Sequence, residues 1–383
     1  MSRRLVIITE IISPYRIPLF NALAQRGNVD LHVLFLAETD PELRQWKVYK
    51  DEIKFSYQVL RSWRKQIGRH NVLLNSGVAQ ALRDSSPGVI LCGGYNYAAS
   101  WQSLLWARVR GVPFLLWSES SARDLRTGWP PVELLKAEFL KQCSGFVVPG
   151  RSAREYLRLQ KIREERIFTA VNAVDNDLFA QSSECARSNV SQLRAELKLS
   201  QRYFLFVGRL VREKGVFELL SAFAKLEVPL REQAGLVFLG DGNCRQELEE
   251  QASQISPGAI KFIGFAQRNQ LPTYYALAEV LVLPTYTDTW GLVVNEGMAC
   301  GLPIIVSEAA GCVADLVTDD WNGLVIPARD ELALRSAMRR LATNPSFRNE
   351  AGSNSRKRID EYSPQKWCEG IERMMVTVGE NRG

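Results

Sequence analysis

Residues 288–306 read DTWGLVVNEGMACGLPIIV, and this stretch is the most informative part of the chain for the fold. The pattern predicts a loop that ends at Gly291, a helix from Leu292, a turn around Gly301 and then a buried apolar strand. Leu292 and Glu296 are four residues apart, so they share one face of this helix. Glu296 then lies within the first two turns of a helix whose amino end suits anionic ligand groups.

The length and composition indicate an ordinary globular protein with two domains. The chain has 383 residues, of which 46% are hydrophobic and 23% are charged. Single hydrophobic cores rarely grow beyond about 250–300 residues, so a second domain is expected. No stretch reaches the roughly 18 apolar residues that a membrane span needs. The apolar start is interrupted by Glu10 and has no small-residue cleavage site, so we expect a strand there and not a signal peptide.

The charge of the chain is unevenly distributed. Residues 1–175 contain 25 Lys and Arg against 16 Asp and Glu, although the formal net charge of the whole chain is only +6. A basic first half favours an anionic surface or substrate on that side, and a solvated basic face is the alternative. No recognisable nucleic-acid-binding motif accompanies the charge, so nucleic acid is not an expected partner.

The cysteines and histidines argue against a metal site. Seven cysteines are scattered without a C-x-x-C pair, and only two histidines occur. An odd number of dispersed cysteines is typical of a reducing compartment, not of a disulfide framework or a zinc site. We therefore expect a cytoplasmic protein without a bound metal.

The first half alternates apolar strands with helical segments. The runs at residues 5–12, 31–36, 89–92, 114–117 and 146–148 are short and rich in β-branched residues, as expected for a parallel sheet that is buried on both faces. The first turn lacks a glycine-rich phosphate loop, so this half is not expected to bind a dinucleotide in the usual way. In such doubly wound sheets, ligands bind at the carboxyl ends of the strands.

Four residues in the first half are candidates for a ligand site because they follow these strands. Tyr15 and Arg16 end the break after the first strand, Gly94 follows the strand at 89–92, and Glu119 follows the strand at 114–117. Gly94 could let backbone approach a ligand closely, although simple turn chemistry is an equally good explanation. Glu119 could equally be a helix cap or a surface carboxylate.

A basic cluster in the first half surrounds a tryptophan. Residues 61–69 contain Arg61, Trp63, Arg64, Lys65 and Arg69. Basic residues beside Trp can mark a segment at a membrane interface, and a solvated loop with one packed Trp is the commoner alternative. The amphipathic run at residues 132–142 allows the same two interpretations.

The domain boundary is predicted where the composition changes. Residues 169–174 are apolar, residues 175–179 suggest a turn, and residues 181–191 are polar. We place the boundary so that residues 1–172 form the first domain and residues 173–363 the second. The last helix, within residues 364–383, is expected to pack back on the first domain.

The second half contains a candidate phosphate-binding loop. A strand at residues 203–207 leads into GRLVREKG, residues 208–215, and an amphipathic helix follows. Backbone N–H groups and the helix dipole favour anions there, and Arg209 and Lys214 add charge and donors. One such loop alone is a weak signal.

Strands and helical segments alternate in both halves of the chain. This alternation predicts an α/β fold of two facing doubly wound, Rossmann-like domains with a cleft between them.

The second half also resembles the donor domain of glycosyltransferase family four, which has the GT-B fold. The matching segments are FVGRLVREKG (206–215), LGDGNCRQELE (239–249), KFIGF (261–265), LPTYTDTWGLVVNEGMACGLPIIVS (283–307) and AAGCVADLV (309–317). They occur in the family's order and spacing over about 140 residues, which makes the match specific. The first half is similar to a subset of the family through ISPYRIPLFNAL (11–23), CGGY (92–95) and WSES (117–120).

The resemblance implies roles for individual residues. Arg209 and Lys214 would bind the donor diphosphate, and Glu296 would accept hydrogen bonds from the ribose hydroxyls. The rest of the donor site would be lined by Gly208, Ile263, Trp290, Gly291 and Leu292. Asp288 stands where the family has a glutamate, so the sugar preference is left open. The family's acceptor-side histidine is also absent, and Glu119 is expected near its position.

By resemblance, the chain is expected to be a retaining, metal-independent glycosyltransferase of the hexosyltransferase type that needs no cofactor. It would use a nucleotide-diphosphate sugar and a glycan or lipid-linked acceptor, as in the biosynthesis of surface polysaccharides. The basic first half fits peripheral association with the anionic cytoplasmic face of a membrane. The alternative is a non-catalytic protein that binds sugar nucleotides, and only Asp288 suggests it. An epimerase or a phosphorylase on the same fold is disfavoured because its motifs are missing.

Overall fold

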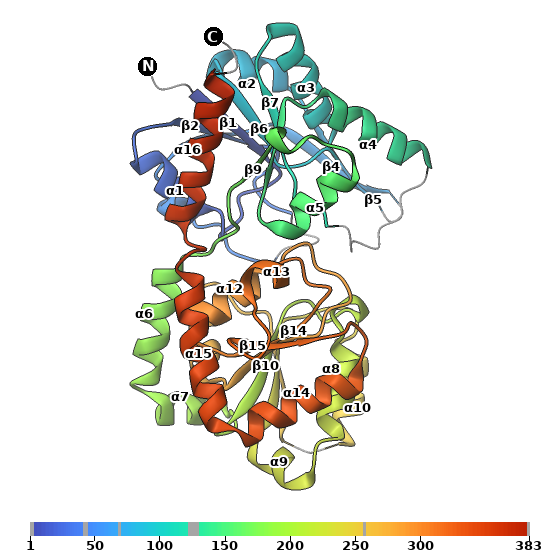
Figure 1. The fold of residues 1–383 in the computed structure, drawn as a ribbon, viewed down its shortest axis with the longest axis vertical. Coiled ribbons are helices and arrows are strands. Elements are labelled where there is room, and N and C mark those ends of the chain that lie inside the picture. Colours follow the sequence, from blue (N-terminus) through green and yellow to red (C-terminus); the bar gives the residue numbers. More distant parts are fainter. Residues whose placement is uncertain (1–3, 41–44, 68–69, 122–129, 256–257, 381–383) are drawn as a thin grey trace. The chain divides into compact units, whose positions relative to one another are not determined.

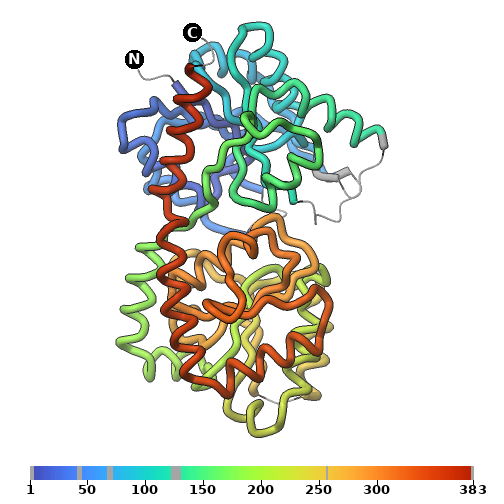
Figure 2. Tube along the Cα trace, in the orientation of Figure 1, coloured from blue at the N-terminus to red at the C-terminus, as the bar shows by residue number. Residues whose placement is uncertain are grey.

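The protein consists of two compact units that we describe from a computed structural model. The structure describes residues 4–40, 45–67, 70–121, 130–255 and 258–380. The first unit comprises Met1–Asn172 together with Pro364–Gly383, and the second comprises Ala173–Ser363. The chain therefore passes between the units twice, which can be followed along the trace in Figure 2.

The first unit is built on a parallel sheet of seven strands in the order β3-β2-β1-β6-β7-β8-β9, with a separate antiparallel hairpin, β4-β5 (Figure 1). Its elements are β1 (Arg4–Thr9), α1 (Ile17–Gln25), β2 (Asp30–Phe35), η1 (Lys50–Glu52), β3 (Ser56–Val59), β4 (Ser62–Ile67), β5 (His70–Asn75), α2 (Val78–Ser85), β6 (Val89–Cys92), α3 (Ala98–Arg110), β7 (Phe114–Trp117), α4 (Pro130–Gln142), β8 (Gly145–Val148), α5 (Arg151–Leu159), η2 (Glu164–Arg166), β9 (Ile167–Thr169) and α16 (Pro364–Glu380).

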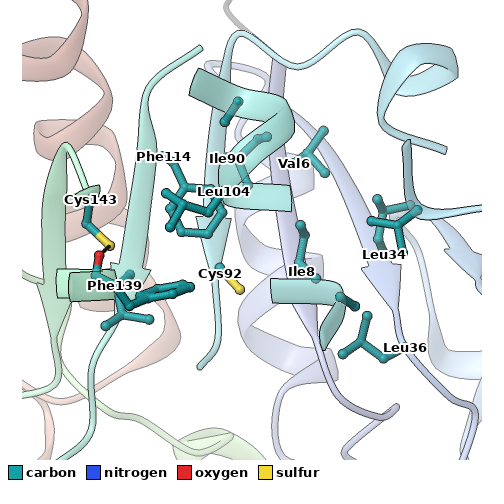
Figure 3. Packing of buried hydrophobic residues seen from close by; sticks show 14 of the residues in the cluster. Val6, Ile8, Leu34, Leu36, Ile90, Cys92, Leu104, Phe114, Phe139 and Cys143 are labelled. Atoms are coloured by element: carbon teal, nitrogen blue, oxygen red, sulfur yellow. Dashed lines mark hydrogen bonds between the residues drawn. The ribbon is translucent and has the colours of Figure 1, made fainter. Parts of the chain in front are cut away.

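The core of the first unit forms because its strands are apolar on both faces. Figure 3 shows how side chains from β1, β2, β6 and β7 meet those of α3 and α4, with Phe114 and Phe139 among the largest. The last helix, α16, packs on α1 and β9 of this unit. Its Trp367 is fully buried, with its ring centroid 5.8 Å from that of Phe20 and 5.7 Å from that of Trp117.

The second unit is a parallel sheet of six strands in the order β12-β11-β10-β13-β14-β15. Its elements are α6 (Asn176–Arg187), α7 (Val190–Leu197), β10 (Tyr203–Val207), η3 (Arg212–Lys214), α8 (Val216–Ala224), α9 (Val228–Gln233), β11 (Gly235–Leu239), α10 (Arg245–Ser253), β12 (Ile260–Gly264), α11 (Leu271–Leu277), β13 (Val280–Leu283), α12 (Leu292–Ala299), β14 (Ile304–Ser307), α13 (Val313–Leu316), β15 (Gly323–Ile326), α14 (Glu331–Thr343) and α15 (Pro345–Ile359).

Two separate cores cover the two faces of this sheet. Successive side chains of a strand point to opposite faces, so Leu205 and Val207 join one buried cluster while Phe204 and Phe206 join the other. Every residue of β10 is buried. The strands can therefore be apolar throughout, as the sequence suggested for a parallel sheet covered by helices on both faces.

The structure corrects the predicted polar connection after residue 174. Residues 175–191, expected as a turn and a polar linker, instead contain the helix α6. The Asp175 side chain accepts a hydrogen bond from the Leu178 amide at 3.0 Å and caps this helix. Phe179, Ser183 and Ala186 are buried at helical spacing, so one narrow apolar face was hidden among polar residues.

Candidate functional site

The strand order of the second unit places two loops side by side. β10 pairs directly with β13, and the sheet order reverses between them because β11 and β12 lie on one side of β10 while β14 and β15 lie beyond β13. Ligands of doubly wound sheets bind at the carboxyl ends of the strands around such a reversal. The loops that follow these two strands are residues 208–215, which begin at the partly buried Gly208, and residues 284–291.

The two loops are joined by close backbone contacts. The carbonyl of Glu213 accepts hydrogen bonds from the Tyr286 amide at 2.8 Å and from Thr285 Oγ1 at 3.0 Å. Gly215 has φ 68°, and a Cβ added there would lie 2.1 Å from the carbonyl oxygen of Pro284. Only glycine fits this position, because a side chain would push the loops apart.

The loop contact brings two of the sequence-predicted residues into direct contact. Lys214 Nζ lies 2.5 Å from Asp288 Oδ2, and the two side chains are only 17% and 19% exposed. The other carboxylate oxygen, Asp288 Oδ1, accepts a hydrogen bond from the Trp290 amide at 3.3 Å. Lys214 is therefore fixed at the end of the sheet by an ion pair that is largely shielded from water.

Arg209 differs from Lys214 in that its guanidinium is unengaged. Its side chain is exposed, and no residue in the described part of the chain forms a hydrogen bond or ion pair with it. Arginine presents a planar set of donors that matches phosphate oxygens. Among the described residues the loop thus offers one exposed cation without a bonded partner, Arg209, and one paired cation, Lys214, for an anionic group.

The other residues of the 288–296 stretch shape the start of α12. Gly291 has φ 96° and is the N-cap of this helix, and Leu292 is its first, partly buried residue. Trp290 is 3% exposed, and its Nε1 donates to Asn295 Oδ1 at 2.8 Å. The indole thereby fixes the loop against the helix that carries Glu296.

Glu296 has an unusual environment for a carboxylate. It is partly buried on α12, and its Oε2 accepts a hydrogen bond from the Tyr275 hydroxyl at 2.6 Å. Burial raises the pKa of Glu296 to about 7, and the Tyr275 hydrogen bond opposes that rise. The carboxyl group is therefore balanced between its neutral and ionised forms near neutral pH.

Ile263 lies near the end of β12, the edge strand two positions from β10. It is partly buried and packs against the core cluster on the same sheet face as Leu205. Of the predicted donor residues, the structure brings Lys214, Asp288 and Trp290 together through direct bonds.

The first unit has its own cluster at the carboxyl end of its sheet. Arg16 forms an ion pair with Glu119 and donates to Asn172 Oδ1 at 3.2 Å. Its guanidinium also lies over the Trp117 ring, 4.0 Å from the centroid. Two candidate acceptor residues that are 103 positions apart in the sequence therefore form one bonded group.

The other two acceptor-side candidates, Tyr15 and Gly94, lie in the loops after β1 and β6 of this unit, and the Arg16 guanidinium is 5.4 Å from the centroid of the Tyr15 ring. The Tyr15 ring makes an edge contact with Trp46, with centroids 6.0 Å apart. Gly94 follows β6 with φ 152°, and nothing lies within 4 Å of the position that a Cβ would take. The open space beside Gly94 is compatible with close approach of a ligand.

The predicted basic cluster at residues 61–69 needs correction. Arg64 is not a free surface cation, because its guanidinium forms ion pairs with Asp40 and with Glu10, the latter at 3.1 Å. The segment is strand β4 of a hairpin and not a loop. Alternation along this strand turns Arg64 inward, while Trp63 faces outward with 52% of its surface exposed. Arg69 lies outside the described residues.

Several partners of the site were missed from the sequence. Tyr275 lies 21 residues before Glu296, and Asn172 lies 53 residues after Glu119. Neither spacing belongs to a local pattern, because the first contact joins helices α11 and α12 and the second joins the loops after β7 and β9. In the described residues, no helix is both long enough and apolar enough to cross a membrane.

Comparison with known proteins shows what the second unit is similar to. Residues 191–358 match the model of the family described as glycosyl transferases group 1. Over 179 residues the chain is 30% identical to an uncharacterized glycosyltransferase of Methanocaldococcus jannaschii. This alignment covers 46% of this chain and 44% of that relative. Over 158 residues it is 29% identical to the GalNAc-alpha-(1->4)-GalNAc-alpha-(1->3)-diNAcBac-PP-undecaprenol alpha-1,4-N-acetyl-D-galactosaminyltransferase of Campylobacter jejuni, with 41% and 43% covered. The matches thus span less than half the length of these two relatives.

The fold is shared over nearly the whole chain. HepE of Anabaena, solved in complex with UDP and glucose, superimposes on 98% of this chain and all of its own chain, with a TM-score of 0.78 at 16% identity. The two Rossmann-like units therefore define a protein of the GT-B class. Residues 191–358 match the glycosyl transferases group 1 model, so the second unit resembles that family, and the fold of the whole chain is the one shared with HepE. This confirms the resemblance recognised from the sequence.

Proposed function

We propose that this protein is a retaining glycosyltransferase of the hexosyltransferase type. It transfers a sugar from a nucleotide-diphosphate sugar to a glycan or lipid-linked acceptor in the biosynthesis of surface polysaccharides. The observation that carries the proposal is the arrangement of Arg209, Lys214 and Asp288 at the reversal point of the second unit's sheet. The Campylobacter jejuni relative, whose name includes a PP-undecaprenol-linked glycan, supports an acceptor of this kind.

In the proposed donor site, the second unit binds the nucleotide sugar through its two loops. Arg209 and Lys214 would bind the diphosphate, and Glu296 would bind the ribose. The site would be completed by the backbone at Gly208, Trp290, Gly291 and Leu292 and by Ile263 near the base. Asp288 would contact the donor sugar once the diphosphate has replaced Asp288 as the partner of Lys214.

The proposed transfer reaction depends on the positive charges of Arg209 and Lys214, which would lie beside the leaving diphosphate. An acceptor hydroxyl oxygen would bond to the anomeric carbon as the bond from that carbon to the phosphate oxygen breaks. The hydroxyl proton would pass to the departing phosphate on the same face of the sugar, which retains the configuration. Arg209 and Lys214 would stabilise the charge that develops on the leaving diphosphate. This electrostatic role is one that a metal ion fills elsewhere, so we propose that the enzyme needs neither metal nor cofactor.

The first unit is proposed to bind the acceptor. Arg16 and Glu119 form a bonded pair, and Tyr15 and Gly94 come from the loops after β1 and β6, the two strands between which this sheet reverses its order. A saccharide needs both donors and acceptors with an aromatic surface beside them, and these residues supply all three.

A donor screen tests the proposal most directly. UDP-, GDP-, ADP- and TDP-linked sugars would be compared by thermal shift, and the best donor would be tested for transfer with and without EDTA. Lys214→Ala and Arg209→Ala should each weaken donor binding about 10-fold or more, because each removes a charge-assisted bond to phosphate. Arg212→Ala is the matched control, since Arg212 lies on the same loop but pairs with Glu247 at 2.9 Å.

The outcomes separate the two candidate functions. Unchanged donor affinity in both Lys214→Ala and Arg209→Ala would refute the loop assignment. Donor binding without turnover, across donors and acceptors, would favour the non-catalytic sugar-nucleotide-binding alternative. The ion pair that already occupies Lys214 is the observation that favours this alternative.

We also propose a cytoplasmic location with peripheral membrane association through the first unit. Trp63 and Leu74 face each other across the β4-β5 hairpin and are 52% and 47% exposed, and Lys65 is exposed on the same strand. On α4, Leu134 and Leu135 are 72% and 58% exposed. Apolar and basic side chains together suit an anionic lipid surface.

Sedimentation with liposomes tests this association. The double variant Trp63→Ala, Lys65→Gln should bind less to vesicles that contain phosphatidylglycerol, while binding to neutral vesicles stays low for both proteins. Equal sedimentation of the variant and the wild type with anionic vesicles would discard the hairpin as a membrane contact.

A further inference from the structure

Tyr275 is a buried tyrosine beside the proposed ribose-binding carboxylate. It lies on α11 and is 0% exposed, and its ring packs against Phe179 of α6 with centroids 6.0 Å apart. Its hydroxyl donates to Glu296 Oε2 at 2.6 Å. The ring cannot turn away without opening the core, so the hydroxyl is held toward the carboxylate by packing.

This contact distinguishes the two oxygens of Glu296. Oε2 is occupied by the tyrosine, whereas no residue in the described ranges donates a hydrogen bond to Oε1. An ionised carboxylate can only accept hydrogen bonds, and vicinal ribose hydroxyls can only be bound firmly by such an acceptor if it is fixed in orientation. Tyr275 supplies that orientation.

We propose that Tyr275 is a positioning residue for the nucleotide ribose: its hydroxyl holds Glu296 through Oε2 and thereby presents Oε1 to the ribose hydroxyls. This inference rests on the proposed function of the second unit as a donor site. It assigns a role, exerted through Glu296, to a residue that the sequence motifs do not include.

The same bond also controls the charge of Glu296. Burial raises the pKa of Glu296, and the bond from Tyr275 lowers it. Cys300 faces Glu296 from the same helix, and its pKa is itself raised by burial. Arg187 of α6 and Arg356 of α15 act on Cys300 at the far end of α12, and the strands β13 and β14 carry no ionisable side chain. Tyr275 is therefore the hydrogen-bonding group that favours the ionised form.

The test compares Tyr275→Phe with wild type in nucleotide binding across pH 5.5–8.5. The probe is the tightest-binding nucleotide of the donor screen, used as the ribonucleotide and as its 2′-deoxy analogue. In the wild type, affinity should rise as Glu296 ionises, with a midpoint near its pKa of about 7. In Tyr275→Phe the midpoint should move to higher pH, and affinity for the ribonucleotide at pH 7 should fall about 10-fold.

The preference for the ribonucleotide over the deoxynucleotide gives the sharper result. If Tyr275 only stabilised the fold, its replacement would weaken the binding of both nucleotides by the same factor. A residue that orients Glu296 affects only the contact with the hydroxyls, so the preference should fall toward 1 in Tyr275→Phe. Glu296→Gln should abolish the pH dependence, and Tyr275→Phe added to Glu296→Gln should change the preference no further.

Tyr274→Phe is the matched control because it makes the same chemical change on the neighbouring residue of α11. Among the described residues the Tyr274 hydroxyl forms no hydrogen bond with Glu296, and the Tyr274 backbone carbonyl accepts one from the Tyr203 hydroxyl at 2.6 Å. This variant should keep the wild-type midpoint and preference. If Tyr275→Phe does not fold, 3-fluorotyrosine at position 275 is the second variant: as a stronger donor it should move the midpoint to lower pH.

Two outcomes would overturn the inference, and both are distinct from failure of the proposed function. An unchanged midpoint together with an unchanged preference in Tyr275→Phe would show that the tyrosine is only structural. If the wild type binds no nucleotide at all, the proposed function fails. The effect of the Tyr275 hydroxyl on the ionisation of Glu296 can still be tested with the ¹³C carboxyl resonance of Glu296, which is assigned by its loss in Glu296→Gln. A higher titration midpoint in Tyr275→Phe supports it, and an equal midpoint rejects it.

Discussion

Glu296 is a residue at which function and stability should conflict. Its pKa is raised to about 7 by burial, whereas an unfolded glutamate titrates near 4.3. The folded state therefore binds more protons than the unfolded state between these values, so stability falls as pH rises through this window. Above pH 7 the full cost of the buried charge is present.

Glu296→Gln should therefore stabilise the protein at pH 8. The amide has the same shape, carries no charge and still offers an oxygen to the Tyr275 hydroxyl. We expect a gain on the order of 2 kcal/mol in the free energy of unfolding at pH 8, which shrinks toward zero as pH falls to 4.5. Urea unfolding at pH 5 and pH 8 measures it, and a variant less stable than the wild type at pH 8 would contradict the buried-charge argument.

Asp288 is the second residue whose role follows from a single contact. Its carboxylate pairs with Lys214 at 2.5 Å, so a donor diphosphate must compete with it for the same ammonium group. Asp288→Asn should bind a nucleoside diphosphate about 3- to 10-fold more tightly, because close opposite charges interact by about 1 kcal/mol or more near a protein surface. Its transfer rate should fall, because the proposed contact between Asp288 and the donor sugar would be weakened.

Calorimetric titration with the nucleoside diphosphate measures this effect. Asp288→Glu is the control, since it keeps the acid and should keep the competition. Weaker binding by Asp288→Asn would mean that Asp288 positions Lys214 for phosphate and does not compete with it.

At the scale of elements, the start of α8 depends on the glycine that precedes it. Gly215 is the N-cap with φ 68°, and the carbonyl of Pro284 occupies the space that a side chain needs. Gly215→Ala should destabilise the second unit by about 3 kcal/mol or more, because strain in the left-handed region adds to a backbone clash. It should also displace Lys214 and weaken donor binding.

Gly111→Ala is the matched control for this substitution. Gly111 ends α3 with φ 62°, but nothing lies within 4 Å of its Cβ position. This variant should lose only about 1–2 kcal/mol, the cost of a left-handed backbone. Chemical denaturation of both variants measures the difference, and equal losses would mean that the contact with Pro284 relaxes easily.

The elements also show where sequence patterns fail. The strands β10 and β13 could be recognised because they are apolar throughout. The hairpin β4-β5 could not, because its outward face carries Trp63 and Lys65 and its inward face carries Arg64, which is satisfied by acids from another part of the chain. Helix α6 was hidden for a similar reason, since only a narrow face of it is buried.

At the scale of the whole molecule, the last helix ties the end of the chain to the first unit. Trp367 is fully buried between Phe20 and Trp117. Trp367→Ala should destabilise the first unit by about 3–5 kcal/mol, the usual cost of removing a buried aromatic side chain. Trp63→Ala, at a site that is 52% exposed, is the control and should cost far less.

Hydrogen exchange resolves this prediction by unit. Peptides from β1, β7 and α1 should lose protection in Trp367→Ala, while those from β10 and β13 keep theirs. Loss of protection throughout residues 173–363 would contradict the assignment of α16 to the first unit's core.

The sequence by itself determined the class of fold and the segments that resemble the family's donor motifs. Apolar runs of strand length that alternate with helical segments can form little else than covered parallel sheets, and residues 206–215 and 283–307 carry chemistry within short, continuous segments. The positive charges of the 208–215 loop and the carboxylate on α12 were visible for the same reason.

Only the tertiary structure decided which of these groups touch. Lys214 meets Asp288, Glu296 meets Tyr275 and Arg16 meets Glu119 across 74, 21 and 103 residues of sequence. The first and third pairs form because parallel strands bring the loops at their carboxyl ends together, and the second forms because helices α11 and α12 pack against each other. The charge state of Glu296 is decided in the same way, since burial and the Tyr275 hydroxyl are properties of its neighbours in space and not of its position in the chain.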